Sequence, residues 1–269
     1  MTALDTDFKK SVLDAALTSF EQSGNPLRLN NLATGLRELI RLVLRDLAPD
    51  ADIKACSWYT REVDKHGNVI ITRSQRLHYA VHAGLPINFV QDTLVVDIAK
   101  TVKDFSVLNG KFSKFTHIEE ATFGVGDSEA ERFAEEALEV FSSLYETIGE
   151  CRKSTYSAME QYAKDAVEDE LFSSVISELD QLATHYTVSQ VNMDDLELTM
   201  DSDRIRLAIG GTVDCDFQYG SSSDVARGDG AESSGAYPFT CKYEASIATP
   251  ADLVLVFDSL KIDNSSFYE

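Results

Sequence analysis

The sequence predicts an α+β protein in which an all-helical N-terminal domain, residues 1–185, is followed by a small antiparallel β domain, residues 186–269. The main observation is a change in the spacing of the apolar residues. They recur about every 3.6 residues as far as His185 and every second residue from Val191 onward. Because alternation gives each strand one buried and one exposed face, we expect the β domain to be antiparallel and sandwich-like.

The helical domain is expected to consist of amphipathic helices separated by turn-forming residues. These helices are expected at residues 7–22, 30–47, 72–83, 87–99, 100–108 and from 127 onward. Asn109-Gly110 is a dipeptide that commonly ends helices, so a break in the chain is expected there. A second break is expected near Ala166, inside the last helical stretch.

The β domain is expected to contain strands that each have one apolar side. They are expected at residues 191–200, 205–209, 213–219, 237–245 and 253–257. The segment 220–235, rich in Ser, Gly and Asp, is expected to be a long hairpin loop. Cys215 and Cys241 lie on two of these strands, either facing each other in a disulfide or, as we favour, as two small core residues.

The charge is distributed unevenly along the chain, whose formal net charge is −21. Residues 1–120 hold 15 Lys/Arg and 15 Asp/Glu, whereas residues 121–269 hold 9 Lys/Arg and 30 Asp/Glu, so the whole excess lies in the second half. That half should repel the phosphates of a nucleic acid. We therefore expect any nucleic acid at the N-terminal domain and a protein partner at the acidic C-terminal domain.

Several enzyme classes and a membrane span are excluded by the sequence patterns. No GxxxxGK[ST], GxGxxG, GxSxG or HExxH motif occurs, which argues against a P-loop NTPase, a Rossmann enzyme, an α/β-hydrolase and a zincin. No apolar run approaches the roughly 18 residues that a membrane helix needs. The first residues are acidic where a signal peptide is basic. We expect a cytoplasmic protein with no cofactor, no bound metal and no membrane contact.

The first candidate site surrounds His117. Asn109, Lys111 and Lys114 precede this histidine, whose side chain titrates near neutral pH. Beside a bound phosphate, His117 would act as an acid or base, and the lysines would bind the phosphate as point charges. The alternative, which the sequence favours, is a capping or packing histidine that satisfies backbone groups at a helix start.

The second candidate is the basic segment from Arg73 to His82. Arg73 and Arg76 are followed at short spacing by His78 and His82, and such Arg/His pairs are typical of the metal-independent HEPN ribonucleases. The two histidines are four residues apart, as in a metal site, but no further ligand completes one. The alternative, which we favour, is a solvated basic face of a helix.

Two further clusters have a structural and a functional interpretation. On the second helix, Glu38 can pair with Arg41 or Arg45, so a salt-bridge network is the default interpretation and a polar patch facing a substrate backbone is the other. In the β domain, a group of carboxylates either holds a divalent cation or, as we favour, forms a charged outer face that protects a sheet edge. Its members are Asp214, Asp216, Asp224, Asp229 and Glu232.

A resemblance to a known family covers nearly the whole chain. It rests on Arg37-Glu38, Cys56-Ser57-Trp58-Tyr59 and Lys114-Phe115-Thr116-His117 in the first half, and on Phe217-Gln218-Tyr219-Gly220, Arg227-Gly228-Asp229-Gly230 and Tyr237-Pro238-Phe239 in the second. These segments resemble the prokaryotic proteins described as predicted pPIWI-associating nucleases, which gene neighbourhood links to Piwi-type and other defence systems. The second set also resembles a tail found on other nuclease-like proteins. The resemblance implies a nuclease role in defence.

Two functions follow as hypotheses. In the first, the helical domain is a nuclease, HEPN-like in its Arg/His pairs, in which His117 is the acid or base, Lys114 and Arg37 bind phosphate, and other polar groups orient them. The candidate catalytic residues are His117, Lys114, Asn109, Arg37, Glu38 and Arg41. In the second, the chain is a non-enzymatic binding or regulatory protein of a defence operon that docks a partner through its acidic β domain.

Overall fold

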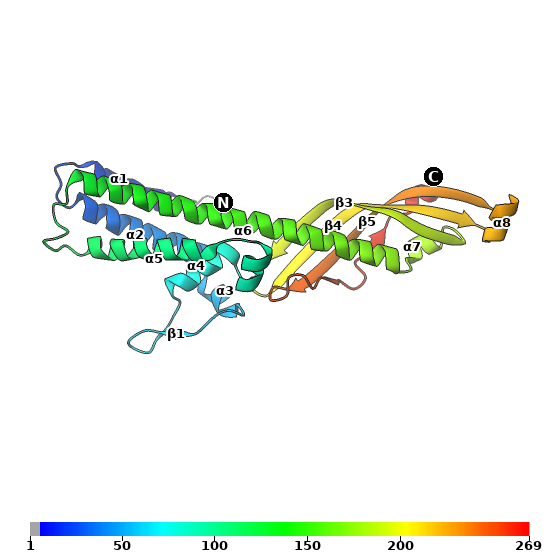
Figure 1. Cartoon of the computed structure of the whole chain (residues 1–269), viewed down its shortest axis with the longest axis horizontal. Coiled ribbons are helices and arrows are strands. Elements are labelled where there is room, and N and C mark those ends of the chain that lie inside the picture. Colours follow the sequence, from blue (N-terminus) through cyan, green and yellow to red (C-terminus); the bar gives the residue numbers. More distant parts are fainter. Residues whose placement is uncertain (1–5, 269) are drawn as a thin grey trace. The chain divides into compact units, whose positions relative to one another are not determined.

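The protein is an α+β protein whose computed structural model describes residues 6–268 (Figure 1). The chain forms two compact units, an N-terminal unit of residues 1–154 and a C-terminal unit of residues 155–269. One helix, α6 (Asp127–Ser173), runs across this division without the break expected near Ala166. The two compact units divide after residue 154, within α6. The first strand of the sheet, β3, begins later in the chain, at His185.

The N-terminal unit is built around helix α2 (Arg28–Leu47), which packs against three other helices. These helices are α1 (Asp7–Glu21), α4 (Arg73–His82) and α5 (Ile98–Thr116). Every third or fourth residue of α2 is apolar, and this stripe is buried, including Leu29, Leu32, Leu36, Ile40 and Val43. The polar side of α2 carries the arginines of the candidate site, so burial of the stripe fixes the direction in which they point.

Helix α5 differs from the sequence prediction, because it continues through Asn109-Gly110 to Thr116. Its apolar residues explain the difference. Phe105, Leu108 and Phe112 are all buried on one side of the helix, across the dipeptide. A glycine inside a helix costs only about 1 kcal/mol relative to alanine, which the burial of two phenylalanines and a leucine outweighs.

Three shorter elements complete the N-terminal unit. The region 50–71, between two of the expected helices, contains α3 (Asp50–Ala55) and a hairpin of two short strands, β1 (Glu62–Val63) and β2 (Val69–Ile70). The expected helix 87–99 is interrupted: residues 87–93 are helical, mostly as the π-helix η1 (Phe89–Thr93), and α5 begins at Ile98. Of the described helices, none is long and apolar enough to cross a membrane.

The C-terminal unit contains the predicted antiparallel strands. The long strands are β3 (His185–Met200), β4 (Arg204–Tyr219) and β5 (Ala231–Ser246), and the short ones are β6 (Val254–Leu255) and β7 (Lys261–Ile262). Rather than two facing sheets, the described strands make one five-stranded sheet in the order β3-β4-β5-β6, with β7 also beside β5. The segment expected to be a loop contains α8 (Ser222–Arg227), and β5 begins at Ala231. A short helix, α7 (Ser177–Asp180), precedes β3, and the 3-10 helix η2 (Ser265–Tyr268) ends the described chain.

The inner face of this sheet packs against the last part of α6 (Figure 1). The Tyr243 hydroxyl of β5 donates to the backbone oxygen of Ala166 at 3.0 Å, and the Tyr156 hydroxyl of α6 donates to the backbone oxygen of Leu196 at 3.3 Å. Alternate residues of β4 and β5 fill the core between them, as the apolar alternation predicted. They include Ile205, Leu207, Ile209, Val213, Phe217, Tyr237 and Phe239.

Cys215 and Cys241 are core residues and form no disulfide. Cys215 lies opposite Gly235, whereas Cys241 lies opposite Ile209, so the two cysteines are not cross-strand partners. Both side chains are buried free thiols, and burial raises the pKa of Cys215 to about 11 and that of Cys241 to about 12. The favoured interpretation of these residues is confirmed.

Gly211 is expected to be indispensable for the sheet, because no side chain fits there. A Cβ atom at Gly211 would lie 2.2 Å from the backbone oxygen of Asn192 and 2.7 Å from the Phe239 ring. Gly211→Ala should therefore lower the free energy of unfolding by about 2–4 kcal/mol. The neighbouring Gly210→Ala is the control, since its nearest atom would be the Cβ of Asp195 at 3.9 Å. Urea unfolding should separate the two variants, and equal midpoints would contradict the packing of this strand.

Candidate active site

Two arginines from different helices converge on helix α5. Arg37 of α2 donates a hydrogen bond from Nη1 to the Thr116 hydroxyl at 2.9 Å. Arg73, the first residue of α4, donates a hydrogen bond from Nη1 to the Asn109 side-chain oxygen. Both acceptors are neutral, and neither arginine forms an ion pair within the described part of the chain. Each guanidinium is therefore held in place while its positive charge stays available to an anion.

The local sequence explains why these two contacts lie on one side of α5. Thr72 and Gln75 form a capping box, which starts α4 at Arg73 and sets the direction of that side chain. On α5, Asn109 and Thr116 are seven residues apart, or about two helical turns, so they lie on the same side of the helix. Packing of α2 and α4 against that side brings Arg37 and Arg73 to their acceptors.

The electrostatics confirm that the two arginines are close. The pKa of Arg73 is lowered, chiefly by partial burial and then by the positive charge of Arg37, while Glu38 acts in the opposite direction. Glu38 accepts a hydrogen bond from Nε of Arg41 at 2.7 Å, so its charge is already balanced. Two like charges held near each other repel, so an anion bound beside them would be stabilised.

His117 follows the Thr116 that binds Arg37. It ends α5 in an extended backbone conformation, and its backbone oxygen accepts a hydrogen bond from the Thr122 hydroxyl at 2.7 Å. The residue is exposed, and its imidazole makes no hydrogen bond or ion pair with any described residue. It is therefore an exposed imidazole that follows the Arg37–Thr116 contact directly in the sequence.

The two lysines of the first candidate do not join the arginines. Lys111 forms an ion pair with Glu136 of α6. The ammonium of Lys114 lies 5.2 Å from the centre of the Phe115 ring, and Lys114 is about 140° around α5 from Asn109. Lys114 therefore lies on another side of the helix from the Arg37 and Arg73 contacts.

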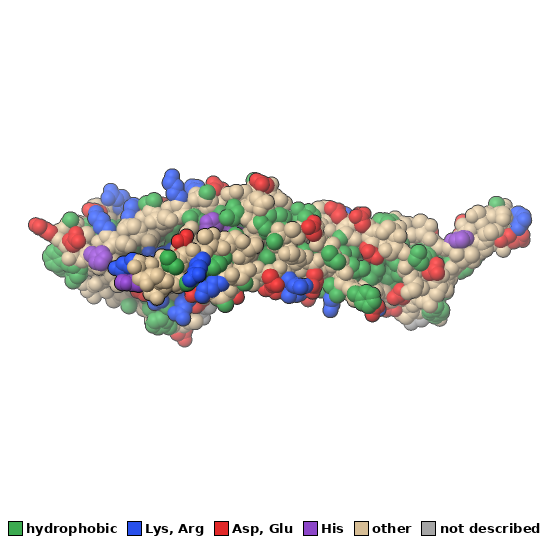
Figure 2. Space-filling model, turned by 90° about the horizontal axis from the view of Figure 1, so that it is seen from below, with side chains coloured by type: hydrophobic (Ala, Val, Ile, Leu, Met, Phe, Trp, Pro, Cys, Tyr) green, Lys and Arg blue, Asp and Glu red, His purple; other side chains and the backbone are tan. Residues whose placement is uncertain are grey.

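The row of arginines on α2 continues from Arg37 toward a basic hollow. This hollow, of about 800 Å³, is lined by Arg41, Arg45, Asp46, Pro49, Asp50 and Arg76. Arg76 donates to the backbone oxygen of Ala48 at 2.7 Å and pairs with Asp50 at 2.5 Å. Figure 2 shows Lys and Arg side chains (blue) gathered on this part of the chain. The arrangement suits the flanking phosphates of a nucleic-acid strand.

The histidines of the second candidate are packed rather than solvated, so the favoured interpretation is wrong for them. His82 is 2% exposed, and its Nε2 lies 3.3 Å from Nδ1 of His78. The Trp58 ring lies 5.5 Å from the His82 ring, and its indole nitrogen donates to the backbone oxygen of Ala83 at 3.2 Å. Burial lowers the pKa of His78, and it lowers that of His82 to about 4. Neither histidine shares the contacts of Arg73 at Asn109.

Three of the five acidic residues of the β-domain cluster, Asp214, Asp224 and Asp229, make local side-chain contacts. Asp224 completes the capping box of α8 and pairs with Arg227 at 2.6 Å, and Asp214 accepts a hydrogen bond from Asn192 at 3.4 Å. Among the described residues, no group of three or more His, Cys, Asp or Glu side chains is arranged to hold a metal ion.

Arg73 and Thr116 are the site residues that the sequence prediction missed. The sequence places Arg73 in the second candidate site, and Thr116 is not among the candidate catalytic residues. The capping signal Thr72-x-x-Gln75 identifies Arg73 as the first residue of α4, and the seven-residue spacing from Asn109 to Thr116 places both on one side of an unbroken α5. Only the second signal depends on α5 continuing through Asn109-Gly110.

Comparison with known proteins gives one family. Residues 1–141 and residues 148–268 each match a family model described as predicted pPIWI-associating nuclease. No curated protein and no solved structure matches the chain. The two matches cover almost all of the sequence, including the helices that carry Arg37, Arg73 and Asn109. The chain therefore belongs to the predicted pPIWI-associating nuclease family.

Proposed function

We propose that the N-terminal helical part of the chain, within residues 1–185, binds a nucleic acid and cleaves its phosphodiester backbone. The observation that supports this most strongly is the convergence of Arg37 and Arg73 with only neutral partners. Two fixed guanidinium groups stabilise the negative charge that develops on a phosphate during cleavage. The family assignment supports the same reaction class and a role in a prokaryotic defence system.

The other groups take supporting roles in this proposal. His117 is the general acid or base, since it is exposed and follows the Arg37–Thr116 contact. Asn109 positions Arg73, and Glu38 positions Arg41. Two groups would contact flanking phosphates rather than the reacting one. They are the basic hollow lined by Arg41 and, on another side of α5, Lys114.

A HEPN-like mechanism would place the acid–base role on His78, which follows Arg73 after four intervening residues. The rings of His78 and His82 lie 5.5 Å apart, and Trp58 packs against both. This packing favours His117 as the acid or base over either of them.

His117→Ala is expected to lower nuclease activity at least about 100-fold while leaving the fold and nucleic-acid binding nearly intact. The exposed His185 of the β domain provides the matched control, since His185→Ala should cleave at the wild-type rate. Cleavage of labelled oligonucleotides and thermal unfolding would be measured on the same preparations. If His117→Ala unfolds the protein, His117 is structural. If the folded variant still cleaves, the catalytic group lies elsewhere, and the His78–His82 pair is the next place to test.

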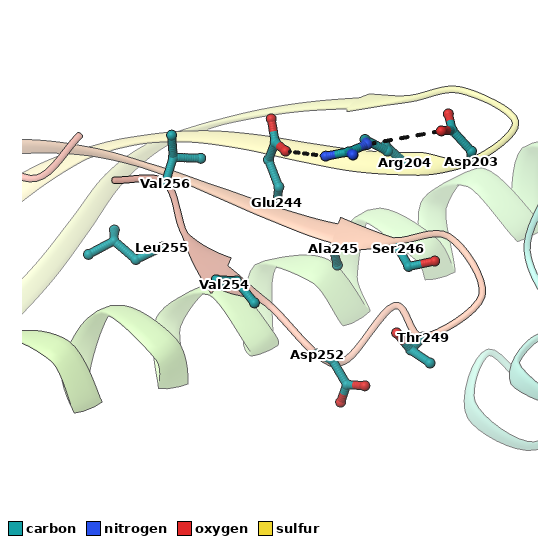
Figure 3. Close-up of a pocket in the computed structure, with 10 residues that line it drawn as sticks. All are labelled: Asp203, Arg204, Glu244, Ala245, Ser246, Thr249, Asp252, Val254, Leu255 and Val256. Carbon is teal, nitrogen blue, oxygen red and sulfur yellow. Dashed lines mark hydrogen bonds and ion pairs between the residues drawn. The ribbon is translucent and has the colours of Figure 1, made fainter. Parts of the chain in front are cut away.

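A second candidate function is a binding or regulatory protein that docks a basic partner through the C-terminal unit. Its specific support is a hollow of about 690 Å³ in which three carboxylates surround one arginine beside the apolar segment Val254–Val256 (Figure 3). The carboxylates are those of Asp203, Glu244 and Asp252, and Arg204 pairs with Glu244 at 2.8 Å. Close to this segment, Phe257 is 97% exposed, which is unusual for a phenylalanine without a partner. A wild-type protein that binds no nucleic acid but retains a basic protein partner would favour this function over the nuclease.

A further inference from the structure

The β1–β2 hairpin projects from the N-terminal unit without packing against it. All four strand residues are exposed, including the apolar Val63 and Val69. A two-stranded hairpin is marginally stable by itself, so its shape requires other support. An apolar pair left in water on such a ribbon also requires an explanation.

The turn supplies the first support. The Asp64 carboxylate accepts hydrogen bonds from the backbone nitrogens of His66 at 2.8 Å and Asn68 at 2.9 Å, and from the Asn68 side-chain nitrogen at 3.1 Å. Gly67 has a φ angle of +82°, which suits glycine and closes the turn. These contacts hold the tip in one conformation.

Gln75 supplies the second support by fastening both ends of the hairpin. Its side-chain nitrogen donates to the backbone oxygen of Thr60 at 2.6 Å, and its side-chain oxygen accepts from the backbone nitrogen of Thr72 at 2.9 Å. Gln75 lies in the first turn of α4, the turn that begins with Arg73. The hairpin is therefore anchored to the helical turn that carries one of the two converging arginines.

The side chains of the hairpin are sorted by charge. The register pairs Val63 with Val69 and Glu62 with Ile70. Alternation then places Arg61 on the side of Val63 and Val69, and Glu62 on the opposite side. Lys65 lies at the tip, and neither Arg61 nor Lys65 forms an ion pair with any described residue. The ribbon thus carries Arg61 with the two valines on one side and Glu62 with Ile70 on the other, and Lys65 lies beside the Asp64 carboxylate at the tip.

We infer that this hairpin is an arm that enters the wide groove of a nucleic-acid duplex bound at the Arg37–Arg73 site. The inference rests on the proposed nuclease function. A two-stranded β ribbon fits the major groove of B-form DNA, whose walls are lined with phosphates. Both faces of the hairpin are exposed, as is required of an element that lies between the two walls of a groove. A single-stranded nucleic acid would cover only one of these faces. Arg61 and Lys65 would contact the phosphates, and Val63 and Val69 the apolar edges of bases.

The test compares the full-length protein with the double variant Arg61→Ala/Lys65→Ala. Its charge-matched control is Lys103→Ala/Lys153→Ala, which removes two exposed lysines from α5 and α6. The probes are a DNA duplex of about 20 base pairs and one of its strands alone, with affinity measured by fluorescence anisotropy over a range of salt. The hairpin variant should bind the duplex about tenfold more weakly, and the slope of log affinity against log salt should fall by about 2, one for each lost phosphate contact.

The same variant should bind the single strand as the wild type does, and the control should bind both probes as the wild type does. An unchanged duplex affinity, or an equal loss for both probes, would overturn the arm while leaving the proposed nuclease function in place. A wild-type protein that binds neither probe would overturn the proposed nuclease function and the arm with it. Because Arg61 and Lys65 are exposed and unpaired, their removal should leave the unfolding midpoint unchanged.

Discussion

Arg73→Ala is expected to lower the rate of phosphodiester cleavage about 100-fold, because one of the two cations that stabilise the transition state is lost. Arg37→Ala should have an effect of similar size. Since Arg73 is exposed and loses only its contact with Asn109, stability should change by no more than about 1 kcal/mol. Cleavage measured under saturating and limiting substrate should show a loss in kcat and in kcat/KM alike, as expected for a contact made in the transition state.

Asn109 offers a sharper version of the same test. Asn109→Asp keeps the shape and the hydrogen bond to Arg73 but places a negative charge against the guanidinium. We expect this variant to bind nucleic acid more weakly and to cleave more slowly, because Arg73 is then neutralised. Asn109→Ala, which frees Arg73 without neutralising it, should be impaired less. Lys103→Ala, on the same helix, is the control for the loss of an exposed polar side chain.

If Arg37→Ala and Arg73→Ala both cleave at the wild-type rate, the arginines serve the fold alone and the proposed site is wrong. Arg73→Lys separates positive charge from geometry. A lysine ammonium cannot bind Asn109 and a phosphate oxygen through one planar group, so it should restore only part of the activity.

The second large effect is a loss of stability in mild acid, caused by His82. Burial holds the pKa of His82 at about 4, below its ordinary value of 6.5, so the folded protein keeps this imidazole neutral where the unfolded chain protonates it. The stabilisation is therefore complete above about pH 6.5 and is lost as the pH falls toward 4. Its full size is about 3 kcal/mol.

His82→Phe removes this titration while keeping an aromatic ring beside Trp58. Urea unfolding of both proteins from pH 7 to pH 4 should show the wild type losing stability relative to the variant by about 3 kcal/mol. A difference between them that does not depend on pH would show that His82 is accessible to protons in the folded protein. The lowered pKa of His78 acts in the same direction and is present in both proteins.

The sequence predicted those elements whose pattern is local and strong. The apolar stripe of α2 and the capping signal at Thr72 gave two helices close to their observed bounds. Alternation in β4 and β5 gave the antiparallel sheet and its buried face. In each case the spacing of the side chains and their burial agree, so no knowledge of distant contacts was needed.

The errors came from contacts between residues far apart in the sequence. Asn109-Gly110 has the local signal of a helix end, yet the burial of Phe105 and Phe112 carries α5 through it. The local sequence predicts that His82 lies on a solvated basic helix face. In the structure, Trp58, which is 24 positions earlier in the sequence, packs against it. The pairing of Arg73 with Asn109 joins α4 to α5 and leaves no trace in the spacing of either helix.

The course of α6 decides where the chain can be cut. Met159, Ala163, Val167 and Leu171 of this helix are all buried, and the compact C-terminal unit begins at Thr155. A fragment that started at residue 186 would leave the inner face of the sheet bare, and a fragment ending at residue 185 would display those four side chains to water. Both would aggregate for the same reason. A soluble fragment that contains the sheet therefore has to start inside helix α6 and not in a loop.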